Sequence, residues 1–140
     1  MTNHITTKWM GNMVFETNNP SGHKFLMDAE AEFGGEGKGF RPKALMLSSL
    51  AGCSGLDVAS LIKKMKLQVD KFHIETFAEL TDEHPKYYNE VKVEYHFYGA
   101  DLDEKKLQRA VDLSVERYCG VMEMFRKFAS VSTEIIFHKS

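Results

Sequence analysis

The sequence has only two cysteines, three prolines and one tryptophan, and charges of neither sign dominate it. A formal net charge of -2 gives no global attraction to nucleic-acid phosphates or anionic lipids. No apolar run approaches the roughly 18 residues that a membrane span needs, and residues 1–10 lack the apolar stretch of a signal peptide. We therefore expect a soluble, cytoplasmic protein with neither nucleic acid nor a membrane as partner.

Several motifs that bind metals or nucleotides are also missing. The glycine-rich stretch 34–39 has Phe40 where a phosphate-binding P-loop needs lysine, so we interpret this stretch as a mobile connection. Histidines occur at six positions without HxxxH or HExxH spacing: His4, His23, His73, His84, His96 and His138. With two distant thiols besides, we expect no zinc site or other metal site and no bound cofactor.

The two cysteines, Cys53 and Cys119, both lie in segments with helical patterning, yet they are far apart along the chain. Their spacing is too wide for a CxxC redox or zinc motif. A chain without an export signal should keep its thiols reduced, which argues against a static disulfide. Two thiols that the fold brings together, one attacking and one resolving, are the minimal apparatus for dithiol chemistry.

The hydrophobic periodicity predicts strands and helices that alternate in an α+β order. The predicted strands are 8–16, 23–28, 72–80, 91–98 and 133–137, and the predicted helices are 42–65, 101–119 and 121–129. Asp101 and Glu104 have the spacing of a capping box at the start of the second helix. The clean alternation over 91–98 predicts one buried face and one polar face, as in an antiparallel pair. The length suits a single domain over 1–140.

The front half of the long helix, 44–53, is apolar or small on nearly all sides. An exposed surface helix would not tolerate that composition, so we expect this half to be enclosed. Gly52 and Gly55 flank Cys53, and each costs roughly 0.5 to 1 kcal/mol relative to alanine inside a helix. Close approach of another helix or of a substrate would explain their presence.

Short motifs spread over nearly the whole chain form a recognisable set. They are Ser21-Gly22-His23, Ala51-Gly52-Cys53-Ser54 with Asp57-Val58, Gly99-Ala100-Asp101-Leu102, and Tyr118-Cys119. Together they resemble the OsmC/Ohr superfamily of thiol-dependent hydroperoxide reductases, and most closely the YhfA-like branch of OsmC-type proteins. The resemblance implies an intertwined homodimer, in which central helices are wrapped by curved antiparallel sheets and thiol sites lie near the subunit interface.

The same resemblance implies a two-cysteine mechanism. Cys53 would be the peroxidatic cysteine that attacks an organic hydroperoxide, and Cys119 the resolving cysteine that captures the sulfenic acid as a disulfide. An external thiol or dithiol would then reduce that disulfide. Attack requires a thiolate, so a cation is expected beside Cys53.

The cation is where this sequence departs from the peroxidase members of the superfamily. Those members use an arginine from an early strand, held by a glutamate that follows a proline like Pro42. Here Lys43 stands at the glutamate position, and no arginine precedes Arg41. Arg41 or Lys43 could supply the cation, or both could be solvated at the helix start; Glu116 could orient a cation or be a surface charge. The alternative function is a non-catalytic redox-sensing or hydrophobic-ligand-binding protein.

Overall fold

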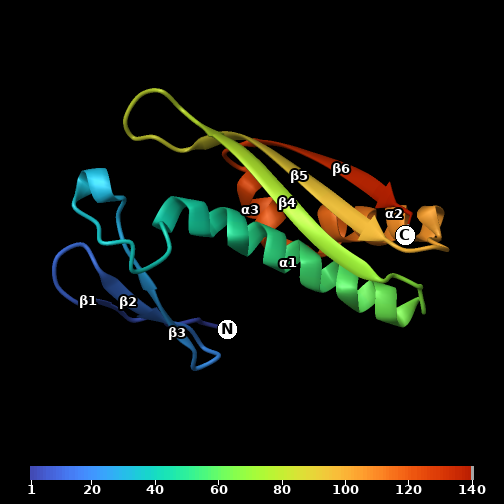
Figure 1. The fold of residues 1–140 in the computed structure, drawn as a ribbon, viewed down its shortest axis with the longest axis horizontal. Helices are drawn as coiled ribbons and strands as arrows, with labels where there is room; N and C mark the ends of the chain where they lie inside the picture. Colours follow the sequence, from blue (N-terminus) through green and yellow to red (C-terminus); the bar gives the residue numbers. More distant parts are fainter. Residues whose placement is uncertain (140) are drawn as a thin grey trace. The chain divides into compact units, whose positions relative to one another are not determined.

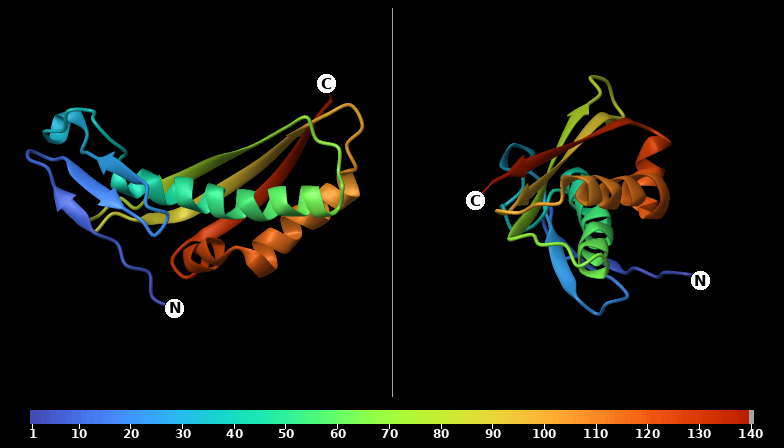
Figure 2. Two further views of the ribbon diagram at one scale, coloured as in Figure 1. Left: turned by 90° about the horizontal axis from the view of Figure 1, so that it is seen from below. Right: turned by 90° about the vertical axis from the view of Figure 1, so that its right-hand side faces the viewer.

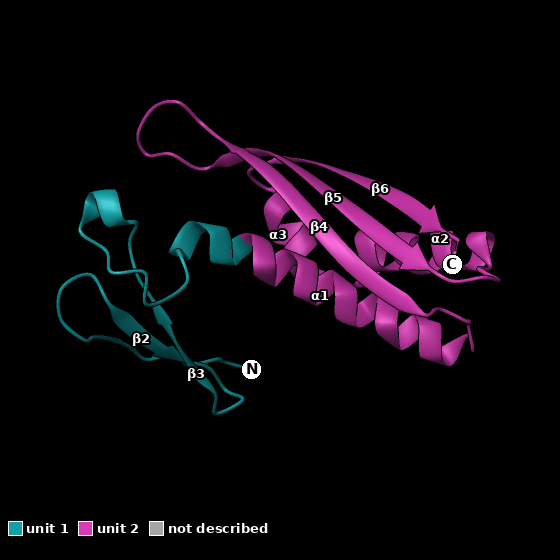
Figure 3. Cartoon of the chain, viewed as in Figure 1, with its two compact units in different colours: residues 1–46 teal, residues 47–140 magenta. Residues whose placement is uncertain are grey.

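The computed structural model describes residues 1–139, which form two three-stranded sheets (Figure 1). Along the chain, a short and a long helix follow the first sheet, and further helical segments precede the last strand of the second sheet. This arrangement confirms the predicted α+β class. The chain divides into two compact units, Met1–Met46 and the part from Leu47 onward (Figure 3). The boundary falls inside helix α1 (Pro42–Lys64), whose bounds match the predicted long helix.

The first unit is an antiparallel sheet of β1 (Thr7–Trp9), β2 (Phe15–Asn18) and β3 (Lys24–Met27), followed by the short 3-10 helix η1 (Ala31–Phe33). The expected single strand over 8–16 is wrong, because Gly11 and Asn12 take positive φ values of 100° and 47° and turn the chain between β1 and β2. The hairpin of β2 and β3 follows the predicted return at 18–22.

The glycine-rich stretch after η1 is held in place by hydrogen bonds to Asp28. Asp28 is buried, and its Oδ2 accepts hydrogen bonds from the backbone N–H groups of Glu36 at 2.9 Å and Lys38 at 3.1 Å. These donors favour the carboxylate and hold the pKa of Asp28 below its usual value. A Cβ at Gly39 would lie 2.3 Å from the carbonyl oxygen of Leu26, so the chain passes β3 too closely for a side chain there. The interpretation as a mobile connection is therefore replaced by that of an anchored loop.

The second unit contains a sheet in the order β4 (Lys71–Leu80), β5 (Tyr88–Tyr98) and β6 (Ser130–His138). Strands β4 and β5 are antiparallel, as the alternation predicted, but β5 and β6 are parallel. The expectation of purely antiparallel sheets fails at this edge for a topological reason. Three helical segments connect β5 to β6, and a crossover of that length returns the chain to the starting end of the sheet.

These connecting segments are α2 (Glu104–Leu113), the π-helical turn η2 (Ser114–Tyr118) and α3 (Gly120–Arg126). The predicted cap of α2 is wrong by two residues. Asp103, not Asp101, caps the helix by accepting a hydrogen bond from the backbone N–H of Lys106 at 3.2 Å.

One face of the β4–β5–β6 sheet is covered by the helices, as Figure 2 shows from two directions. The inward side chains of β5 confirm the predicted alternation: Val91, Val93, Tyr95 and Phe97. They pack against buried side chains from the three helices, namely Leu50, Val58, Leu107, Val111, Met122 and Phe125. This core positions the segments that carry both cysteines.

Helix α1 is less enclosed by its own chain than its composition predicted. Its buried residues are Leu50, Ser54 and Val58, and Leu56 is 75% exposed. By length and composition alone α1 is apolar enough to cross a membrane, a test that core helices of soluble proteins also pass. This finding corrects our expectation that no apolar segment is long enough to span a membrane. Gly, Ala and Ser break up the apolar runs of α1 without adding charge.

Candidate functional site

The two cysteines are held by different helical segments of the second unit. Cys53 lies in the middle of α1, and Cys119 lies between η2 and α3, where it is the N-cap of α3. The backbone N–H of Cys119 donates to the carbonyl oxygen of Ser114 at 2.8 Å, an i to i−5 bond that closes the π-helical turn. Such turns often occur at functional positions, and here the turn ends at the thiol.

The fold brings the two thiols near each other. Cys119 belongs to the buried core and Cys53 packs against it, and both cysteines are free. Cys119 is 4% exposed, whereas Cys53 is half-buried. Burial, partly offset by a backbone N–H from Met122 at 3.3 Å, raises the pKa of Cys119 to about 11. Cys119 therefore keeps its proton at neutral pH.

A chain of buried polar side chains lies in the same core. The hydroxyl oxygens of Ser54 and Tyr95 are 2.7 Å apart, and those of Ser54 and Ser114 are also 2.7 Å apart. The hydroxyl of Ser114 in turn lies 3.0 Å from Oδ2 of Asp57. Ser54, Ser114 and Tyr95 are each 0% exposed, so these groups can satisfy one another but not water.

The carboxylate of Asp57 gives this chain a direction. A carboxylate only accepts, so Ser114 donates its single hydroxyl proton to Asp57. Ser114 must then accept from Ser54, and Ser54 must accept from Tyr95. The chain thus runs from Tyr95 through Ser54 and Ser114 to Asp57, with each hydroxyl donating once.

This polar chain is electrostatically linked to the thiols. The pKa of Tyr95 is raised to about 12, mainly by burial; the hydrogen bond with Ser54 and the charge of Arg126 act in the opposite direction, and the charges of Cys119 and Asp57 act in the same direction as burial. Arg126 is placed by α3, and its guanidinium donates to the carbonyl oxygen of Val115 and pairs with Glu123 at 3.3 Å. Arg126 is thus a cation whose field reaches the buried site.

The other predicted site residues have different surroundings. Arg41 belongs to the first unit, is exposed, and forms an ion pair with Glu30 at 3.3 Å. Lys43 is the second residue of α1. Glu116 is exposed on η2, and within residues 1–139 its carboxylate has no hydrogen-bond or ion-pair partner. The structure does not join Glu116 to a cation, so the interpretation as a surface charge fits it better.

Sequence reasoning missed most of the polar chain. Tyr95 was assigned to the buried face of its strand, but nothing local indicated that its hydroxyl would meet a serine of the long helix. The available signal was Asp57, an acid within an otherwise apolar helix, three residues after Ser54. Arg126 gave no signal, because a basic residue near a helix end is common.

Comparison with known proteins identifies relatives over nearly the full chain. The family model described as OsmC-like protein matches residues 35–134. Protein YhfA of Escherichia coli (strain K12) is 32% identical over 125 residues, which are 89% of this chain and 90% of that protein.

Solved structures share the fold. A hypothetical protein from Aquifex aeolicus VF5 has a TM-score of 0.86 at 27% identity, covering 100% of this chain and 98% of that one. The organic hydroperoxide resistance protein OhrB of Bacillus subtilis has a TM-score of 0.66 at 21% identity, covering 97% and 98%. At that identity the second likeness concerns the fold alone.

Proposed function

Because this chain belongs to the OsmC-like protein family, we propose that it reduces organic hydroperoxides with Cys53 and Cys119 as a dithiol pair. Family membership supports a redox or peroxide-related role. The observation that carries the specific proposal is that two cysteines far apart in the sequence lie near each other in one core, where Cys53 is among the groups that raise the pKa of Cys119.

In the first step, the thiolate of Cys53 attacks an oxygen of the peroxide, and the O–O bond breaks. The organic fragment leaves as an alkoxide, takes up a proton and becomes an alcohol, and Cys53 becomes a sulfenic acid. The assignment of Cys53 as the attacking residue rests on its partial exposure and on the raised pKa of Cys119.

In the second step, the sulfur of Cys119 attacks the sulfenic sulfur, a disulfide forms, and water leaves with the thiol proton of Cys119. An external dithiol then reduces the disulfide, so that one peroxide and one dithiol give one alcohol, one water and one oxidised dithiol. The nearness of the two side chains in one core supports this order, because disulfide formation then requires less movement.

The hydrogen-bonded side chains from Tyr95 to Asp57, together with Arg126, would stabilise the charges and protons of the thiol site during these steps. Tyr95 donates its hydroxyl proton to Ser54, so its oxygen can still accept a hydrogen bond from another group. Arg126 is proposed as a cation that offsets negative charge in this region, a role that the sequence analysis gave to Arg41 or Lys43. Arg41 stays a candidate, although its guanidinium is paired with Glu30.

We also propose that the protein is a homodimer in which a second copy covers α1. A single chain leaves this apolar helix mostly uncovered, with Leu56 75% exposed. An apolar surface of this kind is typical of an interface. Leu56→Lys should shift the protein toward monomer in light scattering after gel filtration, whereas the exposed control Ser60→Ala should not. A monomeric wild-type protein would contradict this part of the proposal.

The test of the activity is steady-state consumption of cumene hydroperoxide with excess dithiol. Cys53→Ser should abolish turnover, because no sulfenic acid can form. In a separate reaction without dithiol, which would otherwise reduce a sulfenic acid, Cys119→Ser should give one equivalent of alcohol per subunit and a sulfenic acid that dimedone traps on Cys53. Circular dichroism of each variant checks folding.

A redox-sensing or ligand-binding protein is the second candidate, favoured by Lys43 at the position where peroxidase members carry glutamate. Such a protein would form the Cys53–Cys119 disulfide once with peroxide and would not turn over with excess dithiol. If the reduced wild-type protein consumes no cumene hydroperoxide beyond one equivalent, the enzymatic proposal is wrong and the sensing function replaces it.

A further inference from the structure

The solvent-facing side of the β4–β5–β6 sheet carries a cluster of histidines and carboxylates far from any sequence motif. Strand register sets His73 of β4 directly opposite His96 of β5, and Tyr98 of β5 opposite His138 of β6. The rings of His73 and His96 stack with centroids 4.5 Å apart. Because side chains alternate along β5, His96 lies on the face opposite Tyr95 and the thiol pair.

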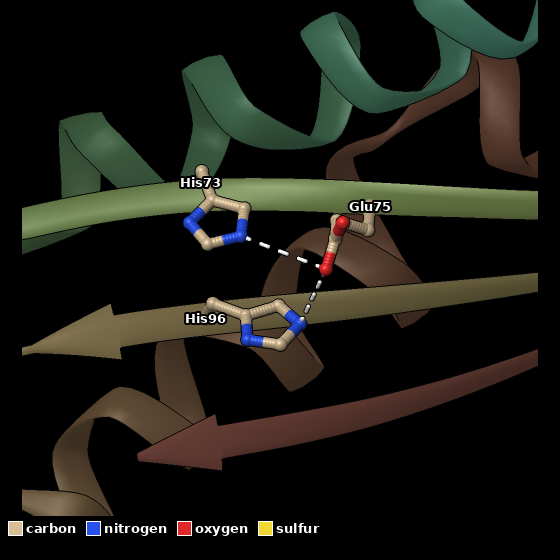
Figure 4. A group of neighbouring side chains, drawn as sticks. All are labelled: His73, Glu75 and His96. Atoms are coloured by element: carbon tan, nitrogen blue, oxygen red, sulfur yellow. Dashed lines mark ion pairs between the residues drawn. The ribbon is translucent and has the colours of Figure 1, made fainter. Parts of the chain in front are cut away.

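Three of these side chains converge on one point (Figure 4). Nε2 of His73 lies 3.7 Å from Oε2 of Glu75, and Nε2 of His96 lies 3.3 Å from the same oxygen. All three ligand atoms lie within 4.8 Å of one another. Tetrahedral zinc with bonds of about 2.0–2.1 Å separates its ligand atoms by about 3.3 Å. The distance between Nε2 of His96 and Oε2 of Glu75 already has this value. The side chains of His73 and Glu75 are half-exposed, so they can rotate to shorten the remaining ligand–ligand distances.

His96 is oriented by neighbours in the way that metal-binding histidines usually are. It is only 9% exposed, and its Nδ1 lies 2.9 Å from Nε2 of His138. A hydrogen bond at the second ring nitrogen fixes the ring and leaves Nε2 directed at the carboxylates. From the sequence we expected no metal site, because the histidines lack HxxxH or HExxH spacing; here the ligands come from two paired strands instead.

The charges around Nε2 of His96 also favour a cation there. Oε1 of Glu94 lies 3.0 Å from this nitrogen, in addition to Oε2 of Glu75. The other oxygen of Glu94 pairs with Lys92 at 3.0 Å, and Lys92 also pairs with Glu134 at 2.8 Å. A divalent cation bound to this nitrogen would lie beside both carboxylates.

We propose that His73, Glu75 and His96 form a binding site for a divalent transition-metal ion, with Zn²⁺ as the best geometric match. The site has two imidazole ligands and one carboxylate ligand, with Glu94 beside them and one coordination position open to solvent. It is independent of the thiol chemistry, because it lies on the other face of the sheet and shares no residue with it.

The experiment titrates the reduced full chain with Co²⁺, which has visible absorption bands when tetrahedrally bound, and with Zn²⁺ in a calorimeter. The wild-type protein should bind one ion per chain with visible bands but without strong near-ultraviolet thiolate absorption. His73→Ala and Glu75→Gln should each weaken binding about tenfold or more. His23→Ala, which removes an exposed histidine elsewhere, is the matched control and should bind as the wild-type protein does.

Both exposed substitutions should leave the fold intact, so circular dichroism can verify that lost binding is not unfolding. Strong thiolate absorption that disappears after cysteine alkylation would assign the metal to Cys53 and Cys119 and overturn the proposal. Unchanged affinity in His73→Ala and Glu75→Gln would overturn it as well, as would absence of binding to the wild-type protein at micromolar metal. Because the readout is metal binding, failure here leaves the peroxidase assay unaffected.

Discussion

Ser114→Ala is expected to destabilise the protein more than Tyr95→Phe, although each change removes one buried hydroxyl. The reason is the direction of the polar chain, in which Tyr95 donates to Ser54, Ser54 donates to Ser114, and Ser114 donates to Asp57. Tyr95 is at the donating end, so its loss leaves no donor without an acceptor. Ser114 is in the middle, so its loss leaves the proton of Ser54 unpaired.

The expected magnitudes follow from this difference. Tyr95→Phe removes one hydrogen bond while the ring keeps its apolar contacts, which costs about 0.5–1.5 kcal/mol. Ser114→Ala leaves the Ser54 hydroxyl, 0% exposed, without its acceptor, and that unsatisfied donor costs about 1–3 kcal/mol beyond the lost bond. Asp57 is half-buried and can replace its donor with water. The two variants should therefore differ by about 1–3 kcal/mol.

Urea unfolding measures both free energies, at a fixed protein concentration because association would also contribute. Ser60→Ala, an exposed serine of the same helix α1, controls for the loss of a serine hydroxyl and should stay within about 0.5 kcal/mol of wild type. If Tyr95→Phe costs as much as Ser114→Ala, the chain does not run toward Asp57 and the reasoning is refuted.

Three further predictions concern pH and packing. The pKa values of Cys119 (about 11) and Tyr95 (about 12) are raised in the folded protein, so the unfolded chain releases these protons at lower pH. The free energy of unfolding should therefore decrease as pH rises above about 8.5 and through 11–12. Urea unfolding at several pH values should show a shallower decrease above about pH 10 in Tyr95→Phe than in the wild-type protein. The lowered pKa of Asp28 contributes stability above about pH 4, and this stability is lost as pH falls through the folded pKa of Asp28. Asp28→Asn should remove this acid dependence in urea unfolding and should speed backbone hydrogen exchange in the loop 34–39. Leu50→Ala, at a site 0% exposed, should cost about 2–5 kcal/mol in urea unfolding, and a cost below about 1 kcal/mol would contradict its place in the core.

The sequence predicted the elements with strong periodicity and failed where a few residues change the chain direction. Helix α1 and the alternation in β5 were predicted closely, because each has a long amphipathic or apolar pattern that depends only on neighbours in sequence. The break between β1 and β2 was missed, since Asn12 takes a positive φ that its identity permits but does not require.

The candidate thiol site was predicted in its residues but not in its geometry. Cys53 and Cys119 were predicted as a pair, and their side chains lie near each other in one core. Glu116, assigned with them, points to solvent instead. Its exposure depends on the π-helical turn η2 and on how that turn packs, which no local pattern in the sequence shows.

The sequence by itself determined the α+β class, the face of β5 that is buried, and the two sulfur atoms available for chemistry. These follow from local periodicity and from composition, which need no knowledge of distant contacts. Only the tertiary structure decided that Tyr95, Ser54, Ser114 and Asp57 form one hydrogen-bonded chain, and that His73, Glu75 and His96 converge on the outer face of the sheet. Strand register and helix packing fix such contacts through the burial of side chains from many separate segments, so no short stretch of sequence encodes them.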